Sequence, residues 1–246
     1  MALRSLSLCA GYGGLELGLS AAGVPSRTAC FVEREGYAAA NLVALMEAGE
    51  VAPAPVWSDL TTFDGEPWRG AADCVLAGFP CQPFSTASRG RRVAPDLWPH
   101  VSRVISECRA PIVFLENVSS EPMERAGREL AAMGYDAAIG RLSSAAVGAP
   151  HRRDRWWLLA YHHGARELLQ PFDGEVARVS ASAFADRWRA PRPDLVGVDD
   201  GRPDGAHRLR LLGNGVVPAQ AALAFKELHK RLITEGQRMA CPVDSP

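Results

Sequence analysis

The stretch LSLCAGYGGLELGL, Leu6 to Leu19, decides the fold class. It begins with a short apolar run typical of a buried β-strand, and the segment after it, Gly14 to Ala22, is expected to be helical. Gly11, Gly13 and Gly14 stand where the strand would pass into the helix. Glycine at such a turn lets the backbone approach a ligand at the helix N-terminus, although a tight turn that binds nothing also uses glycine. The stretch predicts a strand–turn–helix unit with a candidate ligand site at the turn.

The same alternation continues to about Tyr161, through the runs TACFV, CVLAG, PIVFLE and RWWLLAY. Alternation of this kind favours βαβ units in an α/β fold, with a mixed, mainly parallel sheet and helices on both faces. We expect helices over 14–22, 37–48, 100–108 and 124–133, and strands over 6–10, 28–32, 55–57, 74–78, 111–116, 135–142 and 155–161.

The pattern changes between about His162 and Arg208, where RWRAPRPDLVGVDDGRPDGAHR gathers prolines, aspartates, glycines and arginines. Beyond it, PAQAALAFKELHKRLITEG begins with Pro218 and carries apolar residues at helical spacing. This predicts a C-terminal helix that returns to the core. We therefore expect a main domain over 1–161, a small module over 162–208, and a closing segment with its helix over 209–246.

The composition fits one ordinary core, with 246 residues of which 47% are hydrophobic. A formal net charge of -1 excludes a uniformly basic nucleic-acid binder but leaves room for a local cationic cleft. The 6 cysteines form no C-x-x-C pair and no cluster at zinc spacing, so we expect reduced thiols and no metal. Neither a signal peptide nor a membrane-spanning run is present, so we expect a cytoplasmic protein with no membrane role.

The segment GFPCQPFS, Gly78 to Ser85, places Cys81 between Pro80 and Pro83. Proline fixes φ on both sides, which would present the thiol in one orientation at the carboxyl end of a central strand. Open α/β sheets place their ligands at that edge. A free cysteine is otherwise most often a small buried hydrophobe. Prolines and a glutamine are unusual around a core position, so an exposed and oriented thiol is favoured.

Glu33 ends the next predicted strand, about 20 residues beyond the glycine turn, where a carboxylate can accept hydrogen bonds from ribose hydroxyls. The turn and this carboxylate together predict a nucleoside-containing cofactor. A nicotinamide-dependent dehydrogenase would share both features, so the choice between cofactors depends on other motifs.

Further motifs follow in order: AGYGG at 10–14, VERE at 32–35, SDL at 58–60, GFPCQPFS, FLENV at 114–118, HRRDRWW at 151–157 and LGNGVVP at 212–218. In this order they resemble the cofactor loop, ribose motif, adenine motif, nucleophile loop, second catalytic motif, Gln-x-Arg-x-Arg strand entry and closing motif of the C5-cytosine DNA methyltransferases. The resemblance extends over nearly the whole chain. It implies a Rossmann-like methyltransferase fold, a catalytic and cofactor-binding domain over 1–161, and a reduced target-recognition module over 162–208.

The resemblance also implies a chemistry. Cys81 would add to carbon 6 of cytosine, so that carbon 5 can attack the methyl group of S-adenosylmethionine. Glu116 would hydrogen-bond or protonate ring nitrogen 3, and this role requires that burial raise its pKa. Arg155 would bind the cytosine carbonyl oxygen, with Arg153 as its neighbour, and Asn117 would order the cysteine loop.

The implied cofactor is S-adenosyl-L-methionine, with S-adenosyl-L-homocysteine as product. Its expected site comprises Ala10, Gly11, Tyr12, Gly13, Gly14, Leu15, Glu33, Arg34, Asp59, Leu60, Gly78, Pro80, Leu97, Asn214, Gly215 and Val216. The chain departs from the family pattern at several of these positions. Arg34 stands where an aromatic residue is often seen, and Gly215 replaces a frequent serine, which leaves only backbone to meet the cofactor's carboxylate. Cys9, where phenylalanine is usual, is expected as a strand residue.

The implied partner is double-stranded DNA, from which the target base must be flipped. Expected DNA contacts are Gln82, Ser85, Arg89, Arg91, Arg92, Arg187, Arg189 and Arg192, although the arginine-rich loop after Cys81 could also be a solvated surface loop. Only about fifty residues are available for target recognition, so we expect a short target such as GpC or CpG, with GpC favoured.

Other functions remain open at this point: a catalytically weak DNA-binding protein of the same fold, or an RNA cytosine methyltransferase. A dehydrogenase is disfavoured because it leaves Pro-Cys-Gln and Glu-Asn-Val unexplained. We expect a monomer that serves a restriction system whose nuclease is a separate chain, or a stand-alone or phage-type modification enzyme.

Overall fold

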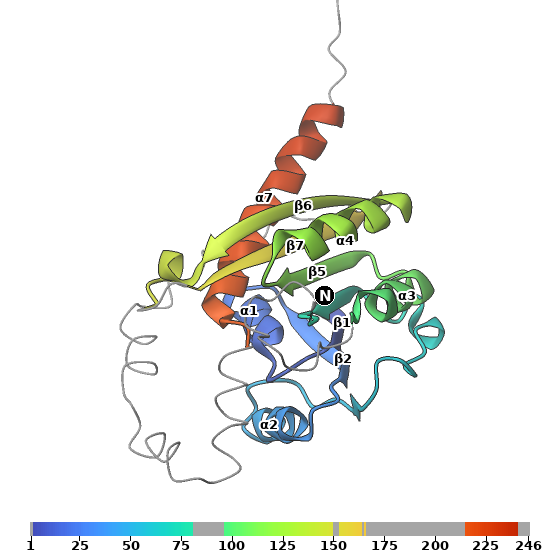
Figure 1. The fold of residues 1–246 in the computed structure, drawn as a ribbon, viewed down its shortest axis with the longest axis vertical. Helices are drawn as coiled ribbons and strands as arrows, with labels where there is room; N and C mark the ends of the chain where they lie inside the picture. Colours follow the sequence, from blue (N-terminus) through green and yellow to red (C-terminus); the bar gives the residue numbers. More distant parts are fainter. Residues whose placement is uncertain (1, 81–95, 150–152, 164, 166–214, 241–246) are drawn as a thin grey trace, which may run out of the picture.

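A seven-stranded sheet with the order β3-β2-β1-β4-β5-β7-β6 forms the centre of the protein (Figure 1). The computed structural model describes residues 2–80, 96–149, 153–163, 165 and 215–240. The strands are β1 (Leu3–Leu8), β2 (Ser26–Val32), β3 (Val56–Trp57), β4 (Cys74–Ala77), β5 (Ile112–Asn117), β6 (Tyr135–Ser143) and β7 (Asp154–His162).

The sheet is mixed and mainly parallel. β1 to β5 pair in parallel, whereas β7 lies between β5 and β6 and runs antiparallel to both. Because β7 runs against β5, its first residues, Asp154 and Arg155, lie at the edge where the parallel strands end. The predicted α/β class and the mainly parallel sheet are confirmed. The antiparallel direction of β7 is what brings its N-terminal arginine to the ligand edge.

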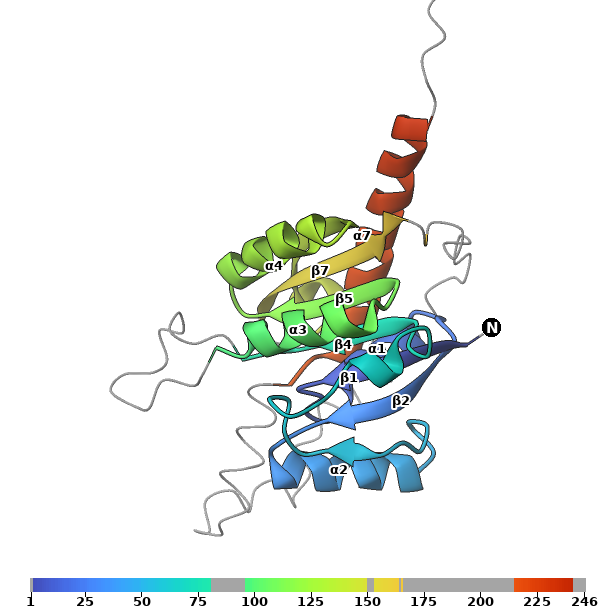
Figure 2. The same cartoon turned by 90° about the vertical axis from the view of Figure 1, so that its right-hand side faces the viewer.

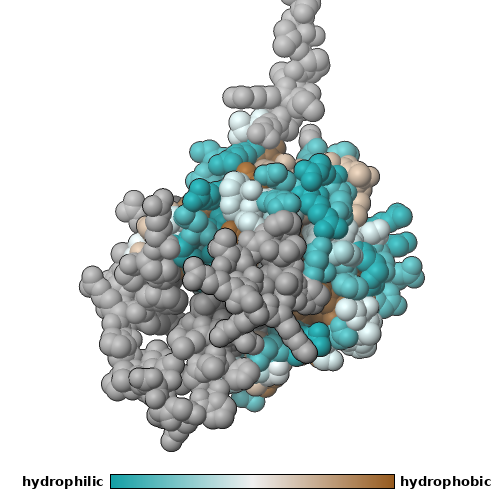
Figure 3. Space-filling view, in the orientation of Figure 1, coloured by the Kyte–Doolittle hydropathy of each residue, from teal (hydrophilic) through white to brown (hydrophobic). Residues whose placement is uncertain are grey.

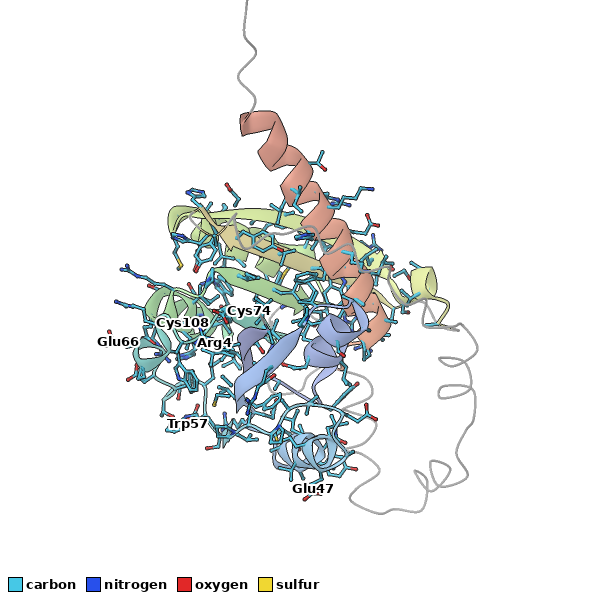
Figure 4. The ribbon with its side chains drawn as sticks, turned by 180° about the vertical axis from the view of Figure 1, so that it is seen from behind. Arg4, Glu47, Trp57, Glu66, Cys74 and Cys108 are labelled. Carbon is cyan, nitrogen blue, oxygen red and sulfur yellow. The ribbon has the colours of Figure 1, made fainter. Side chains whose placement is uncertain are left out.

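Helices cover both faces, as predicted. They are α1 (Gly14–Ala21), α2 (Gly36–Glu47), α3 (Trp98–Cys108), α4 (Ser120–Ala132) and α7 (Pro218–Ala240), with short 3-10 turns η1 (Glu66–Trp68) and η2 (Ser144–Val147). Successive side chains of a strand point to opposite faces. Val75 and Val113 therefore pack in one cluster with α3 and α4, while Leu76 and Phe114 pack in another with α1 and α7. Figure 2 shows the layers from the side, and in Figure 4 α7 crosses in front of the sheet.

The observed element ends differ from the predicted ones by a few residues. The helix expected from residue 124 begins at Ser120, because Pro122 lies in the first turn, where its missing N–H costs no hydrogen bond. The helix expected from residue 100 begins at Trp98, and Pro99 occupies the same kind of position. The expectation that Cys9 is a strand residue was wrong. β1 ends at Leu8, and Cys9 has a φ of 52°, which starts the turn.

Helices α1 and α7 pack closely against each other. A Cβ added to Gly18 would lie 2.5 Å from the Ala221 Cβ and 3.1 Å from the Pro218 carbonyl oxygen. A Cβ added to Gly14 would lie 2.7 Å from the Val216 carbonyl oxygen. Glycine at both positions lets the helices meet at backbone distance. The segment before α7 is thereby pressed against the glycine turn after β1.

The coloured residues on the face seen in Figure 3 are mostly hydrophilic, with small hydrophobic spots between them. Large hydrophobic side chains that are exposed are Tyr37, Val43, Trp57 and Val118. Within the described residues, no helix has both the length and the apolar character needed to cross a membrane. Figure 4 labels Arg4 and Cys74, which lie at the beginning of β1 and β4. Arg4 pairs there with Asp73 at 2.9 Å, away from the edge where the parallel strands end.

Candidate functional site

The glycine turn after β1 faces the end of β2. Gly11 and Gly13 have φ values of 57° and 75°, and Gly13 is the N-cap of α1, so the turn uses backbone that favours glycine. The Gly11 amide donates to Glu33 Oε2 at 2.7 Å, and the Glu35 amide donates to Glu33 Oε1 at 2.8 Å. Two backbone donors thus hold the carboxylate in one orientation. Each of its oxygens has a second lone pair, which suits the hydroxyls of a ribose.

Burial raises the pKa of Glu33, while the backbone hydrogen bonds from Glu35 and Gly11 act against that rise. Asp59 follows β3, and its Oδ1 accepts from the amide and hydroxyl of Thr61 at 2.9 and 2.8 Å. These bonds lower the pKa of Asp59, and the nearby charge of Arg34 adds to the effect. The structure therefore places two carboxylates beside the ends of β2 and β3, where the sequence predicts contacts to a nucleoside.

The structure also describes other sequence-predicted cofactor residues, on several elements. The Ala10 amide donates to the Val32 carbonyl at 3.2 Å. Leu15, in the first turn of α1, packs in the hydrophobic core. Leu60 is buried, and Leu97 is the N-cap of α3 and packs against the core. Pro80 is exposed, lies two residues after Gly78, and is the last residue of the described range 2–80.

Glu116 is the buried carboxyl at the end of β5. Its Oε1 lies 2.8 Å from Nε of Arg155, and the two side chains are 7% and 14% exposed. Burial raises the pKa of Glu116 to about 7, although the charges of Arg155 and Arg153 pull it down. Desolvation is the dominant cause, since it prevails over two adjacent cations. A carboxyl of this kind can hold a proton near neutral pH and donate it to a bound ring.

Arg153 links this centre to the closing segment. Its Nη2 donates to the Gly215 carbonyl at 2.6 Å, and its amide donates to Ser144 Oγ at 3.0 Å. The Gln220 side chain donates to the Arg153 carbonyl at 3.0 Å and to the Leu142 carbonyl at 2.8 Å. Sequence reasoning missed Ser144 and Gln220. The signal for Gln220 was a lone amide on the apolar face of the predicted C-terminal helix.

Asn117, the last residue of β5, contacts the start of the cysteine loop, which begins at Gly78. The Asn117 side chain donates to the Phe79 carbonyl at 3.0 Å and accepts from the Val118 amide at 2.7 Å. A Cβ added to Gly78 would lie 3.5 Å from Glu116 Oε2 and 3.8 Å from Val216 Cγ2. The chain that leads toward residue 81 therefore passes directly beside the Glu116 carboxyl.

Several sequence-predicted residues lie outside the described residues. They are the nucleophile candidate Cys81, the cofactor residue Asn214, and the DNA contacts Gln82, Ser85, Arg89, Arg91, Arg92, Arg187, Arg189 and Arg192. Most of the expected module over 162–208 is outside as well. Within the described ranges, no group of three or more histidine, cysteine, aspartate or glutamate side chains could hold a metal ion.

Comparison with known proteins gives a family match. A family model described as C-5 cytosine-specific DNA methylase matches residues 3–187. The type II methyltransferase M.CviJI of Paramecium bursaria Chlorella virus IL3A is 29% identical over 237 residues, which cover 93% of this chain and 60% of that protein. The type II methyltransferase M.HhaI of Haemophilus parahaemolyticus is 26% identical over 171 residues, which cover 65% of this chain and 50% of that protein. The chain thus matches only part of the length of these relatives.

Solved structures share the fold. A putative DNA modification methyltransferase encoded within an Escherichia coli prophage superposes with a TM-score of 0.54 at 24% identity, covering 67% of this chain and 48% of that chain. The Dnmt2 methyltransferase of S. pombe superposes with a TM-score of 0.50 at 22% identity, covering 65% of this chain and 51% of that chain. Both likenesses show the fold.

Proposed function

Because the chain belongs to the C-5 cytosine-specific DNA methylase family, we propose that it transfers a methyl group from S-adenosylmethionine to carbon 5 of a flipped cytosine in duplex DNA. The observation that carries this proposal is the buried Glu116, whose pKa is raised to about 7 beside Arg155 at the carboxyl edge of the sheet. A dehydrogenase has no use for such a centre next to a loop that leads to a cysteine.

The proposed reaction proceeds through a covalent bond to the protein. The Cys81 thiolate adds to carbon 6, and the displaced ring electrons reach nitrogen 3, where Glu116 supplies a proton. Arg155 holds the ring carbonyl oxygen and stabilises the charge that develops there. When bound, S-adenosylmethionine supplies an electrophilic methyl group on a sulfonium. Carbon 5 takes this methyl group, which leaves S-adenosylhomocysteine as the other product. A base then removes the carbon 5 proton, the sulfur–carbon 6 bond breaks to release Cys81, and nitrogen 3 returns its proton to Glu116.

The residues around the glycine turn fit S-adenosylmethionine. Glu33 presents a carboxylate held by two amides at the end of β2, where ribose hydroxyls would bind. Asp59 stands at the end of β3 for the adenine amino group. A Cβ added to Gly11 would meet nothing within 4 Å, so the backbone of the turn is open there for the rest of the ligand.

The remainder of the proposal concerns the target. We assign 1–161 to catalysis and cofactor binding, 162–208 to a reduced target-recognition module, and 209–246 to the closing segment and helix. With so few residues for reading bases, the target is short, and GpC is favoured over CpG.

The protein acts as a monomer in the cytoplasm, on DNA of its own cell or of an infecting phage.

Trapping tests the function. A duplex oligonucleotide with 5-fluorocytosine at the target forms a permanent adduct, because fluorine at carbon 5 cannot leave as a proton. With S-adenosylmethionine present, we expect wild type to give one covalent complex, which peptide mass spectrometry places on Cys81. The matched control Cys81→Ser should give none. If wild type binds S-adenosylhomocysteine but forms no adduct on any GpC or CpG duplex, the proposal is wrong.

A further inference from the structure

The Tyr12 side chain, in the glycine turn after β1, reaches Gly215 in the segment before α7. A Cβ built on Gly215 would overlap three atoms of Tyr12, namely the hydroxyl oxygen, Cζ and Cε1. The phenol therefore occupies the space in which any side chain at position 215 would begin. Glycine at 215 and tyrosine at 12 are a matched pair, because any larger residue at 215 would overlap the ring in its present position.

The surroundings of the Tyr12 hydroxyl suit an anion. Burial raises the pKa of Tyr12, so the phenol stays neutral and can donate. The charges of Arg153 and Glu116 both reach the hydroxyl, and the Arg153 guanidinium is anchored on the Gly215 carbonyl at 2.6 Å. The first turn of α1 begins two residues later, and the first amides of a helix lack intrahelical acceptors. A neutral donor thus lies within the electrostatic reach of a cation, two residues before the start of a helix.

We propose that the Tyr12 hydroxyl donates a hydrogen bond to the carboxylate of the cofactor's amino-acid portion, and so replaces the side chain that position 215 lacks. This inference rests on the proposed function, because it takes S-adenosylmethionine as the ligand. Glycine at 215 has only backbone atoms that could contact that carboxylate. The Tyr12 hydroxyl, from the glycine turn after β1, lies where a side chain at 215 would begin. Tyr12 is then a cofactor-positioning residue.

Calorimetric titration tests the carboxylate contact. The probes are S-adenosylhomocysteine and 5′-deoxy-5′-methylthioadenosine, which lacks the amino-acid portion. We expect Tyr12→Phe to weaken S-adenosylhomocysteine about tenfold or more, since a bond to a charged group is lost, and to leave methylthioadenosine unchanged. Tyr37→Phe, at an exposed tyrosine on α2, is the matched control and should change neither. Equal weakening of both probes, or no change in either, would overturn the inference.

A residue swap tests the matched pair. Gly215→Ser alone should abolish binding of S-adenosylhomocysteine, because its Cβ would overlap the phenol. Tyr12→Leu removes the three overlapping atoms, so Tyr12→Leu with Gly215→Ser should bind at least about fivefold more tightly than Tyr12→Leu alone. A double variant no better than Tyr12→Leu contradicts the inference. Wild type that fails to bind S-adenosylhomocysteine would instead refute the proposed function, so the two failures are distinguishable.

Discussion

At the scale of single residues, Glu116 shows how environment sets chemistry. Arg155 is in contact and Arg153 is near, and both stabilise the ionised carboxylate, yet burial still raises its pKa to about 7. An exposed glutamate with the same partners would remain ionised well below neutral pH. The motif Glu-Asn-Val predicted the residue. The role expected of Glu116 also required its burial, but its ion pair with Arg155 could not be predicted, because it depends on β7 lying beside β5.

The first prediction concerns pH. Glu116 donates a proton only when it is protonated. We therefore expect kcat/KM to reach its maximum at pH values below the pKa of Glu116 and to fall as pH rises above about 7. Glu116→Gln should lower kcat by about a hundredfold or more and remove the falling limb. Methyl transfer measured between about pH 6 and about pH 9 checks this. Glu124→Gln, on the exposed side of α4, should keep the limb, and a wild-type profile with no falling limb up to about pH 9 contradicts the assignment.

The second prediction concerns Asn117. Its side chain is buried and satisfies the Phe79 carbonyl, so Asn117→Ala leaves a buried acceptor without its donor. We expect a loss of about 1–3 kcal/mol in the free energy of unfolding. Urea denaturation measures that loss. Because the Phe79 carbonyl lies at the start of the cysteine loop, kcat should fall while the affinity for S-adenosylhomocysteine stays within about twofold. Unchanged stability would show that the hydrogen bond contributes nothing.

At the scale of elements, the α1–α7 contact explains why a helix carries glycine on its inner face. Glycine costs about 1 kcal/mol relative to alanine inside a helix. Gly18 offsets that cost by letting the Ala221 Cβ approach its backbone. The same contact brings Val216 onto Gly14 and so places the segment before α7 against the glycine turn after β1.

The third prediction inverts the usual effect of alanine. Gly18→Ala should destabilise the protein by about 1–3 kcal/mol, because the new methyl group forces α1 from α7. Thermal unfolding with and without S-adenosylhomocysteine measures the loss, and the ligand affinity should also fall because the closing segment moves. Gly36→Ala is the matched control. It lies at the start of α2, its added Cβ would meet nothing within 4 Å, and it should be neutral or stabilising. A stabilised Gly18→Ala variant contradicts the close packing.

Most elements could be predicted from periodicity, because each strand and helix of this sheet carries its own apolar pattern. The strand at RWWLLAY was predicted as a run of apolar residues, but such a run carries no information on direction. The antiparallel direction of β7 depends on pairing with β5 and β6, which are distant in sequence. The overlap of Tyr12 with Gly215 depends in the same way on two segments that meet only in the fold.

At the scale of the whole molecule, a net charge of -1 means that any attraction to DNA must be local. The fourth prediction concerns the salt dependence of DNA binding. The logarithm of the DNA association constant falls linearly with the logarithm of the salt concentration. The double variant Arg91→Ala/Arg92→Ala should reduce the steepness of this fall by about two, since each phosphate contact contributes about one. Arg27→Ala/Arg128→Ala, at exposed positions of β2 and α4, is the matched control and should keep the wild-type slope. Equal slopes for all three proteins would remove Arg91 and Arg92 from the DNA contacts.

The fifth prediction concerns the mark itself. Bisulfite sequencing of DNA from cells that express the protein should show methylcytosine at nearly every GpC, and at few cytosines in other contexts. The physical reason is that a short recognition segment contacts few base edges. A strict target of four or more bases would contradict the reduced module, whereas methylation confined to CpG would correct only the choice between the two dinucleotides.

The contact between α1 and α7 also has a consequence for biosynthesis. Translation runs from the N-terminus, so α1 emerges from the ribosome long before the helix that covers it. Until residues 215–228 follow, the apolar side chains of Leu15 and Leu19 lack their α7 partners, and the glycine turn lacks the strip of backbone that closes it. A nascent polypeptide that ends before α7 consequently lacks the contacts that bury Leu15 and Leu19 and that close the glycine turn in the folded protein.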